Sequence, residues 1–405
     1  MQEVRFEKLD KTSYQMTLDN YFKVLVAPMI KSEKVTIGIN IDKGSFSKPM
    51  KIGNQIIYLG TAAYLFEAIR KYHSKEASIL FEEGIKDVSS INKSYTSFAF
   101  EVPQDRYLEC IKALFALVNS IDFTNDQIED MKKDMVDLAS NEKEDLVANN
   151  LFIFSPIKNS TYGGANSIKN IHLVALKKFF NEYYIPSNMT LVVTGNVDQK
   201  KIEEVVNTFE FEKKTKKDNV IVTEYNERYD DLIKEEVNGE EENKVTLGFK
   251  FDKREKLFDD FQNNLFALYL TLPELVFSKT NSVFNSYVKS YKTIASSSLV
   301  EASEEAYLKV TFETDSKEKL IEELKAYLSD MRIKFKDVSS IKKEVLAKYR
   351  EIYINDSTTY YYDILNSLAN NFFFLALVLQ IKSIGYFTFK KFIRRFSKFR
   401  HVIVK

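Results

Sequence analysis

The three histidines of this chain, His73, His172 and His401, are the first residues to consider for metal chemistry. A zinc site on one helix needs two ligands about one turn apart, and these histidines are too scattered to form such a pair. His73 lies in a polar segment with Ser74 and Lys75, so we interpret it as a solvated helix end. The histidines alone therefore predict no zinc site.

Three further features could do chemistry, but each has a simpler structural interpretation. The single cysteine, Cys110, lies in an apolar run and is expected to be a buried, inert thiol. Glu82 and Glu83 are adjacent on an expected helix, where their carboxylates diverge, so we assign them to a solvated face. Gly163 and Gly164 lack the Lys-Ser/Thr of a P-loop and the Rossmann spacing, which indicates a turn with no nucleotide.

The composition excludes some classes of partner. Lys+Arg and Asp+Glu are equal at 58 each in 405 residues, so no global field favours nucleic acid or an anionic membrane. A single cysteine is typical of a reducing compartment, and residues 1–7 contain no apolar signal-peptide core. We therefore expect a cytoplasmic protein without an internal disulfide framework.

A long internal repeat organises the chain. Residues 34–43, Lys-Val-Thr-Ile-Gly-Ile-Asn-Ile-Asp-Lys, return 210 positions later as residues 244–253, Lys-Val-Thr-Leu-Gly-Phe-Lys-Phe-Asp-Lys. Solenoid repeats are far shorter, so a period of this length indicates a duplicated domain. We predict an N-terminal domain at 1–212, a charged linker at 213–230 and a C-terminal copy at 231–405.

Hydrophobic periodicity predicts the same order of elements in both copies. Segments 22–27 and 34–42 are expected to be paired strands. The other elements expected in the first copy are helices 57–72, 105–119, 125–146, 172–184 and 199–209 and strands 94–102 and 189–193. In the second copy we expect strands 244–251 and 306–313 and helices 259–275, 316–334 and 338–353. Strands separated by helical pairs, with an antiparallel start, indicate an α+β fold.

Residues 183–198, Tyr-Tyr-Ile-Pro-Ser-Asn-Met-Thr-Leu-Val-Val-Thr-Gly-Asn-Val-Asp, describe a Pro-terminated helix that enters a buried strand. Gly195 suits the tight turn after this strand, and Asp198 suits the cap of the next helix. The segment resembles the Tyr-x-Pro-x-Asn-Met-x-Leu-x-Val-x-Gly-Asp/Asn-Val-Asp signature of the pitrilysin/insulinase family, the inverzincins, which includes the mitochondrial processing peptidases and their bacterial relatives. The resemblance spans about residues 20–360 and implies tandem domains arranged as a clamshell.

The same resemblance places the family's catalytic helix at Gly60-Thr61-Ala62-Ala63-Tyr64-Leu65-Phe66-Glu67. The family motif H-x-x-E-H supplies two zinc ligands and a general base, and a second Glu about 75 residues on completes the site. Here Ala63 stands for the first His, Phe66 for the Glu and Glu67 for the second His, and the distal ligand falls near Asp137. The resemblance therefore implies a non-catalytic member in which the family's zinc, and any other cofactor, is absent.

The second copy also departs from what the resemblance implies for an active member. Family members have a Gly-rich loop followed by an Arg and a Tyr that help to hold the substrate carbonyl. Here loop 275–280 has no glycine, Val288 stands for the Arg and Ser296 for the Tyr. Lys289 could replace the Arg only if the register slips by one. Loss at both places favours a pseudoenzyme.

Two functions stay open at this stage. The first is a non-catalytic subunit that pairs with a zinc-bearing sister peptidase and contributes peptide binding. The alternative is a divergent peptidase that is zinc-independent or uses a relocated site. Family members hold substrates as an extra strand on an exposed sheet edge. The candidate edge in this chain is formed by Tyr95, Thr96, Ser97, Phe98, Ala99 and Phe100, although an ordinary half-buried strand has the same pattern.

The last forty residues allow three interpretations. Phe389 falls 210 positions after Phe179, and residues 402–404 fall 211 after 191–193, which predicts the final helix and strand of the second copy. The basic stretch 389–400 has Phe at helical spacing and could instead lie on a membrane surface. The tail could also be out of frame, with a truncated second copy. The apolar run 372–381 is too short to span a bilayer.

Overall fold

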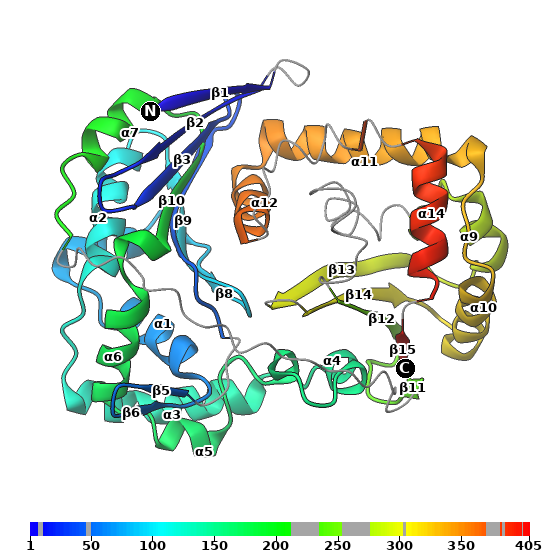
Figure 1. The fold of residues 1–405 in the computed structure, drawn as a ribbon, viewed down its shortest axis with the longest axis horizontal. Helices are drawn as coiled ribbons and strands as arrows, with labels where there is room; N and C mark the ends of the chain where they lie inside the picture. Colours follow the sequence, from blue (N-terminus) through cyan, green and yellow to red (C-terminus); the bar gives the residue numbers. More distant parts are fainter. Residues whose placement is uncertain are drawn as a thin grey trace. The chain divides into compact units, whose positions relative to one another are not determined.

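The structure is a computed structural model that describes residues 1–6, 11–45, 50–211, 235–252, 276–302, 305–369, 381–382, 385–398 and 400–405. The expected linker 213–230, the expected helix 259–275 and nearly all of the apolar run 372–381 lie outside these residues. Two compact units make up the described chain (Figure 1). The first contains the described parts of 1–143, 159–223 and 351–374, and the second those of 144–158, 224–350 and 375–405. Each unit thus includes a segment from the other half of the sequence.

A mixed sheet forms the centre of the first unit, with strand order β1-β2-β3-β10-β4-β9-β7 and β8 also paired to β9. Its strands are β1 (Gln2–Phe6), β2 (Lys11–Thr17), β3 (Lys23–Pro28), β4 (Lys34–Ile41), β7 (Lys86–Asp87), β8 (Ser90–Ile91), β9 (Thr96–Pro103) and β10 (Met189–Gly195). The prediction that 22–27 and 34–42 pair with each other was wrong. β10 lies between them, parallel to β3 and antiparallel to β4, because this long apolar strand is buried in the middle of the sheet.

Helices cover one face of this sheet and form the main core. They are α1 (Thr61–Lys71), α2 (Tyr107–Asn119), α3 (Asn125–Asn141), α5 (Ala165–Lys169), α6 (Leu173–Tyr183) and α7 (Gln199–Val206), and a small hairpin, β5 (Met50–Ile52) and β6 (Gln55–Ile57), lies beside them. Side chains alternate between the two faces of a strand, so the odd-numbered residues of β4 point to these helices. Val35, Ile37 and Ile39 are completely buried there.

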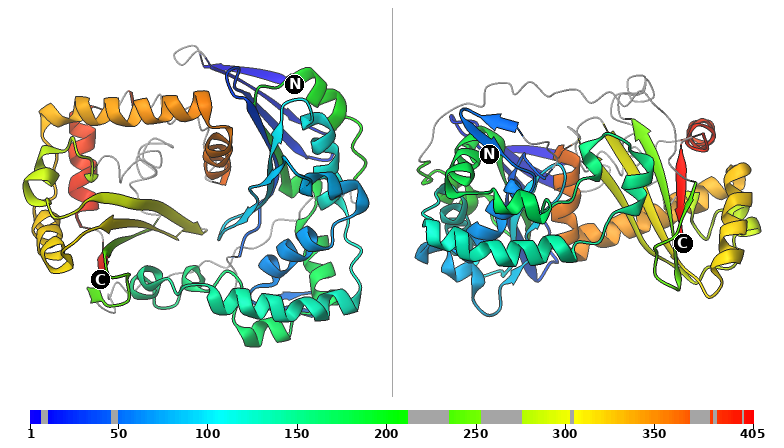
Figure 2. Two further views of the ribbon diagram at one scale, coloured as in Figure 1. Left: turned by 180° about the vertical axis from the view of Figure 1, so that it is seen from behind. Right: turned by 90° about the horizontal axis from the view of Figure 1, so that it is seen from below.

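The other face of the first sheet carries α12 (Ser357–Ala369), which follows α11 (Phe335–Asn355) along the chain (Figures 1 and 2). The contacts are polar: the Oγ1 of Thr36 lies 2.9 Å from the Oγ of Ser357, and the Oγ of Ser97 lies 2.8 Å from the hydroxyl of Tyr361. Between them the ring of Tyr361 lies directly on Gly38, where a Cβ would come within 2.0 Å of its hydroxyl oxygen. Only glycine at this position lets the helix approach so closely.

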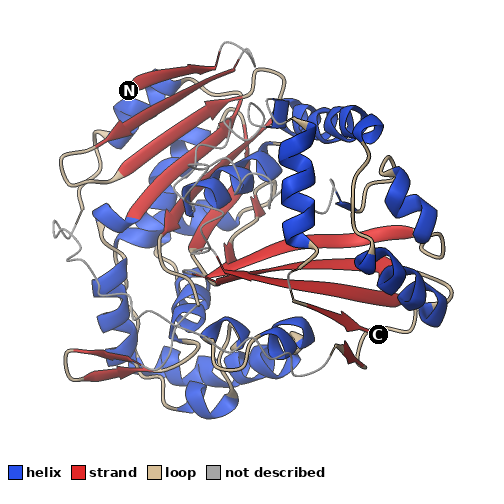
Figure 3. Ribbon diagram, turned by 45° about the vertical axis from the view of Figure 1, so that its right-hand side comes forward, coloured by secondary structure: helices blue, strands red, loops and turns tan. Residues whose placement is uncertain are grey.

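The second unit is built on a five-stranded sheet with the order β11-β15-β12-β14-β13 (Figure 3). Its strands are β11 (Glu236–Val237), β12 (Lys244–Asp252), β13 (Thr293–Ala302), β14 (Glu305–Glu313) and β15 (His401–Val404). Its helices are α4 (Leu146–Leu151), α9 (Ser282–Tyr287), α10 (Lys317–Ser329), α14 (Tyr386–Phe396) and the first part of α11. The α+β class is confirmed.

The 210-residue repeat reaches through three paired strands of each sheet. Gly38 pairs with Ala99 and Val192, and Gly248 pairs with Lys309 and Val402, each 210 positions later. The offset of 211 expected for residues 402–404 was therefore wrong by one. The error matters because a shift of one residue turns every side chain of a strand to the opposite face.

The repeat also explains the exchanged segments. A Cβ on Gly248 would lie 2.2 Å from the Cγ1 of Val147, so α4 packs on β12 as α12 packs on β4. Ser357 of α12 follows Val147 of α4 by 210 positions. The two helices are thus counterparts in the repeat, and each one belongs to the unit that contains the other copy's sheet.

The C-terminal residues form the final helix and strand of the second unit, as the structural interpretation predicted. β15 pairs with β12 on one side and with β11 on the other. On α14 the side chains of Phe389, Phe392, Ile393 and Phe396 are buried, and the ring of Phe396 lies 4.4 Å from that of Phe249. The phenylalanines of this basic helix therefore pack in a core. None of the helices in the described part of the chain is both long and apolar enough to cross a membrane.

We expect Gly38→Ala to destabilise the first unit by about 1–3 kcal/mol, because the added methyl group overlaps a fully buried tyrosine ring. Urea unfolding followed by circular dichroism measures this loss. Gly164→Ala is the matched control, since a Cβ there meets no atom within 4 Å. Combining Gly38→Ala with Tyr361→Leu should cost less than the sum of the two single changes; strict additivity would contradict the proposed contact.

The tail allows a second test of packing within one helix. Phe396→Ala should lower the stability of the second unit by about 3–5 kcal/mol, because the ring is fully buried. Phe387→Ala, at a side chain that is 81% exposed on the same helix, should change it by less than about 0.5 kcal/mol. Thermal unfolding and limited proteolysis report both effects, and equal effects would argue against burial of this helix.

Candidate functional site

The helix that the resemblance assigns to zinc chemistry, α1, begins at a contact between two glycines. Gly60 and Gly163 have φ angles of 83° and 79°, a region that side chains disfavour. A Cβ on Gly60 would lie 2.0 Å from the carbonyl oxygen of Tyr162, and one on Gly163 would lie 2.5 Å from that of Leu59. This close approach brings the loop with Tyr162 to the start of α1, and it explains the Gly163-Gly164 pair as a turn.

The positions expected to be catalytic on α1 are core residues. Ala63 is completely buried, and Phe66 is 3% exposed with its ring centroid 5.2 Å from that of Phe98 on β9. Between them, Tyr64 is buried and donates its hydroxyl to the backbone carbonyl of Ile128 on α3. This turn of the helix therefore presents apolar side chains to the sheet and offers no group that could take a proton from water.

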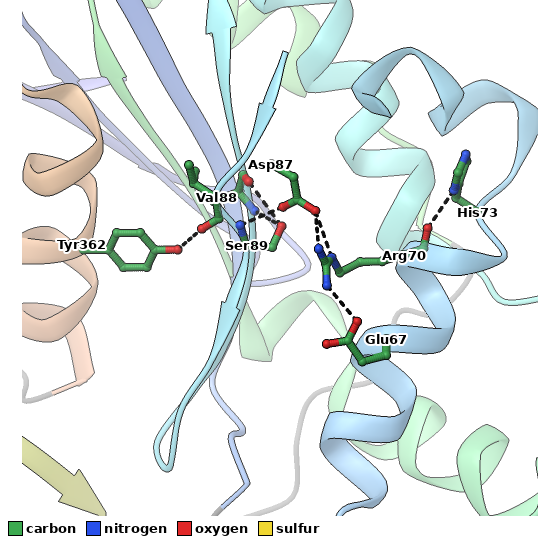
Figure 4. Close-up of polar contacts among 8 residues, drawn as sticks. Glu67, Arg70, His73, Asp87, Val88, Ser89 and Tyr362 are labelled. Carbon is green, nitrogen blue, oxygen red and sulfur yellow. Dashed lines mark hydrogen bonds and ion pairs between the residues drawn. The ribbon is translucent and has the colours of Figure 1, made fainter. Parts of the chain in front are cut away.

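Glu67, the remaining motif position, has its counter-charge on the same helix. Arg70 donates to the Oε2 of Glu67 at 2.8 Å and, through Nε and Nη2, to the Oδ2 of Asp87 at 3.0 and 2.6 Å (Figure 4). Burial raises the pKa of the Glu67 carboxyl, and the guanidinium of Arg70 offsets part of that rise. The guanidinium thus joins α1 to β7 at the place where the resemblance expects a metal ligand.

The same network continues to the edge of the sheet and to α12. Asp87 accepts from the backbone N–H of Ser89 at 2.8 Å, and Tyr362 of α12 donates to the carbonyl of Val88 (Figure 4). At the other end, His73 Nδ1 lies 2.8 Å from the carbonyl of Arg70. His73 therefore lies at the C-terminal end of α1, and its ring stacks on Phe81.

A second carboxylate approaches Glu67 from the end of α3. Glu142 accepts hydrogen bonds from the hydroxyl of Ser160 and from the backbone N–H groups of Thr161 and Tyr162. Burial raises its pKa, but these donors outweigh burial and hold the pKa below its ordinary value. Burial raises the pKa of the Tyr162 hydroxyl, and the nearby carboxylates of Glu67 and Glu142 raise it further, so Tyr162 lies close to both carboxylates. Glu142 is thus an ionised group whose oxygens are already occupied.

The distal position is expected near Asp137, and a second carboxylate, Glu142, follows at the C-terminal end of α3. Asp137 is an exposed residue of α3, and its neighbour Asp134 pairs with Lys71 at 2.7 Å instead. Glu142, the C-cap residue of α3, is the carboxylate that shares Tyr162 as a neighbour with Glu67. Across the described ranges there is no group of three His, Cys, Asp or Glu side chains that could hold a metal ion. Glu67 and Glu142 alone are two hydrogen-bonded carboxylates, which do not match the nitrogen and sulfur ligands that zinc prefers.

The other candidates of the sequence lie apart from this cluster. His172 caps the start of α6 near Glu129, and His401 lies on β15 in the second unit. Cys110 is completely buried in α2, and burial raises the pKa of its thiol to about 11. A protonated, enclosed thiol is a poor nucleophile. Glu82 pairs with Arg106 on the surface at 2.9 Å.

The expected substrate-binding edge is covered on both sides. β9, with Tyr95 just before it and Thr96, Ser97, Phe98, Ala99 and Phe100 within it, pairs with β4 along its whole length. On the other side β7 pairs at Phe100 and β8 pairs at Ser97, and the N–H of Val88 donates to Ala99 between them. The prediction of an exposed edge at these residues was therefore wrong, because the short strands that follow α1 fold back onto β9.

The structure also places the positions that the resemblance expects to be substituted in the second unit. Val288 is buried after α9, whereas Ser296 is exposed on β13, which has a strand neighbour on one side only within the described sheet. The N–H of Lys289 donates to Glu323 at 2.8 Å. The hydroxyls of Ser278 and Thr280, from the loop without glycine, donate to Glu344 at 2.6 and 2.8 Å. These contacts stabilise the loop, and Lys279 of the loop lines one pocket together with Ser296 and Lys348.

Sequence reasoning did not identify Arg70, Asp87, Glu142 or Tyr162 as neighbours of Glu67. One signal was present: Glu142 lies 75 positions after Glu67, the spacing that the resemblance gives for the distal Glu. The others depend on the return of the chain after α1 and on the Gly60–Gly163 contact, which no local pattern reveals. The assembled cluster can bind a polar group through Glu67 and Arg70, but it contains no activated nucleophile or free base.

Comparison with known proteins gives a family match and several structural matches. Residues 170–343 match the family model described as the peptidase M16 inactive domain. A comparison with curated protein sequences gives no match. Because the family match begins after α1, the chemistry of that helix is judged from its own residues.

Solved structures of low sequence identity share the fold over nearly the whole chain. An M16-like peptidase from Alicyclobacillus acidocaldarius is 15% identical with a TM-score of 0.77, and 97% of each chain is covered. A protease from Helicobacter pylori is 16% identical with a TM-score of 0.73, covering 97% of this chain and 99% of that one. A peptidase M16 inactive domain from Pseudomonas fluorescens is 14% identical with a TM-score of 0.68, again with 97% of each chain covered.

The fold, the family match and the residues of α1 agree with the resemblance seen in the signature at 183–198. That signature forms the end of α6 and strand β10, in the middle of the first sheet. Residues 170–343 thus match the peptidase M16 inactive domain, and the whole chain shares the fold of these solved structures.

Proposed function

We propose that this protein is a non-catalytic subunit that pairs with a zinc-bearing sister peptidase and contributes peptide binding. The observation that carries the proposal is the state of α1. Ala63 and Phe66, at the positions of the first zinc ligand and the general base, are packed in the core, and Glu67 is paired with Arg70. A fold kept in full with its reactive groups replaced is what a binding or supporting subunit requires.

The replacement of the H-x-x-E-H motif is part of this proposal. Placing Ala63, Phe66 and Glu67 on the motif is supported by the burial of the first two side chains on the sheet-facing side of α1. It is also supported by Glu142, which lies 75 positions after Glu67, the spacing of the distal Glu, and shares Tyr162 with it as a neighbour. In this proposal the chain keeps the helix, the adjoining loop and a distal carboxylate of the family's zinc site, but it lacks both histidine ligands. A cytoplasmic location stays a prediction from the single cysteine.

The purified chain should bind no stoichiometric zinc, because Ala63 and Phe66 cannot coordinate a metal and Glu67 is paired with Arg70. Elemental analysis after dialysis measures this, with an H-x-x-E-H member of the family treated in parallel as the positive control. About one zinc per chain would refute the prediction.

Reversion separates the motif positions from other possible metal sites. The triple variant Ala63→His, Phe66→Glu, Glu67→His should acquire zinc if it folds, whereas Glu67→His alone should not, because the three groups act as a unit. Zinc binding by the single variant would place the metal elsewhere.

Mixing the chain with an H-x-x-E-H family member from the same cell should give a stable heterodimer. Stable complexes typically bury on the order of 1,600 Å², which analytical ultracentrifugation detects as a defined species. Peptidase activity of the pair should be abolished by changing the motif Glu of the sister to Gln and should survive Glu67→Gln in this chain. Chelator-sensitive hydrolysis by this chain alone would favour the alternative, a divergent peptidase with a relocated site.

A further inference from the structure

A polar pocket lies on the first sheet, on the face that carries α12 and away from the Glu67 cluster. Its volume is about 380 Å³, within the range of small-ligand sites. The floor is a row of paired residues that crosses neighbouring strands: Thr17 beside Lys23, Lys23 beside Thr190, and Thr190 beside Asn40. Leu368, near the end of α12, and Tyr95 form part of the wall.

The side chain of Asn40 has an unsatisfied hydrogen-bond acceptor in this pocket. Its side chain lies on β4 two residues from Gly38, on the α12 face, and is 8% exposed. The Oδ1 atom is buried and has no hydrogen-bond partner in the described part of the chain. A buried amide oxygen left without a donor costs about 1–3 kcal/mol, so its persistence in a pocket wall indicates a ligand that supplies the donor.

The repeat shows that the fold does not require this arrangement. The position equivalent to Asn40, 210 residues later, is Lys250, whose ammonium lies 4.6 Å from the ring centre of Phe152. The second unit thus gives the same strand position a partner within the protein. In the first unit, by contrast, the Oδ1 of Asn40 has no hydrogen-bond partner among the described residues, and Asn40 lines a pocket.

Charges of opposite sign flank Asn40. Lys23 on β3 and Asp42 just after β4 both line the pocket and are exposed, and neither forms an ion pair with a described residue. β10 lies between their strands, so two strand spacings of about 4.8 Å separate the backbones. An extended peptide advances about 3.3–3.6 Å per residue, so about two to three residues bridge such a gap.

We propose that this pocket binds a short zwitterionic peptide with free ends. The peptide carboxylate lies at Lys23, its ammonium group lies at Asp42, and the carboxamide of Asn40 pairs with one peptide group, accepting its N–H at Oδ1 and donating from Nδ2 to its C=O. The inference deepens the proposed peptide-holding role, but it concerns the first unit alone and does not depend on a sister subunit.

The probe is trialanine with free ends, titrated into the full chain by isothermal calorimetry and compared with N-acetyl-trialanine amide. We expect saturable binding of the free peptide, with Kd no weaker than about 1 mM, and at least tenfold weaker binding of the blocked one. Lys23→Gln should weaken binding about tenfold, because it removes the ion pair with the peptide carboxylate. Amidation of the peptide C-terminus removes the same ion pair, so it should cause no further loss of affinity in this variant. Asp42→Asn should do the same for N-acetylation. Lys51→Gln, at an exposed lysine on β5, is the control and should bind as the wild type does.

Asn40→Leu gives an independent readout. It should abolish binding and raise the midpoint of thermal unfolding, because an apolar side chain of similar size removes the unpartnered oxygen. A variant that loses both binding and stability would assign Asn40 a structural role, and the Lys23 and Asp42 variants would then decide the proposal. No saturable binding of trialanine to the wild type, or equal binding of the blocked peptide, would overturn it, while a heterodimer with a sister subunit would still stand.

Discussion

The packing of a helix onto a glycine in the central strand is the contact on which both units depend. β4 and β12 are buried on both faces, so each needs a second layer on the side opposite its main helices. Gly38 and Gly248 let α12 and α4 approach the backbone directly, and any larger residue would overlap Tyr361 or Val147. Because each covering helix comes from the other half of the sequence, neither half contains a complete unit. Because of this exchange, each copy of the duplicated domain needs a helix from the other copy to complete its unit.

The same layer links the sheet to the polar cluster around Glu67. α12 holds the outer strands of the first sheet through Tyr362 and Val88, and the adjoining Asp87 anchors Arg70. Arg70 in turn supplies the positive charge that a partly buried Glu67 needs. A carboxylate in this position is otherwise costly, since burial disfavours its charged form. The network keeps α1 in place with a fixed internal cation, and it leaves neither Glu67 nor Glu142 free to act as a base.

The face of the first sheet under α12 differs from its core face in chemistry. The core face is mainly apolar, whereas the α12 face carries Thr36, Ser97 and Asn40 beside Gly38. Where α12 covers these groups, they are satisfied by Ser357 and Tyr361. Near the end of α12 Asn40 has no such partner, and the polar row opens into a pocket.

The sequence by itself determined the duplication, the α+β class and the helix-to-strand segment at 183–198, and it predicted that Ala63 and Phe66 replace reactive side chains. These follow from local spacing: a repeat, a period and a residue type can be read without knowing what lies nearby. Tertiary structure decided that β10 lies between β3 and β4, that β7 and β8 cover β9, and that Glu67 and Glu142 both lie near Tyr162. It also decided that α4 and α12 are exchanged. Each of these is a pairing between distant segments, and its energy comes from contacts that local sequence does not encode.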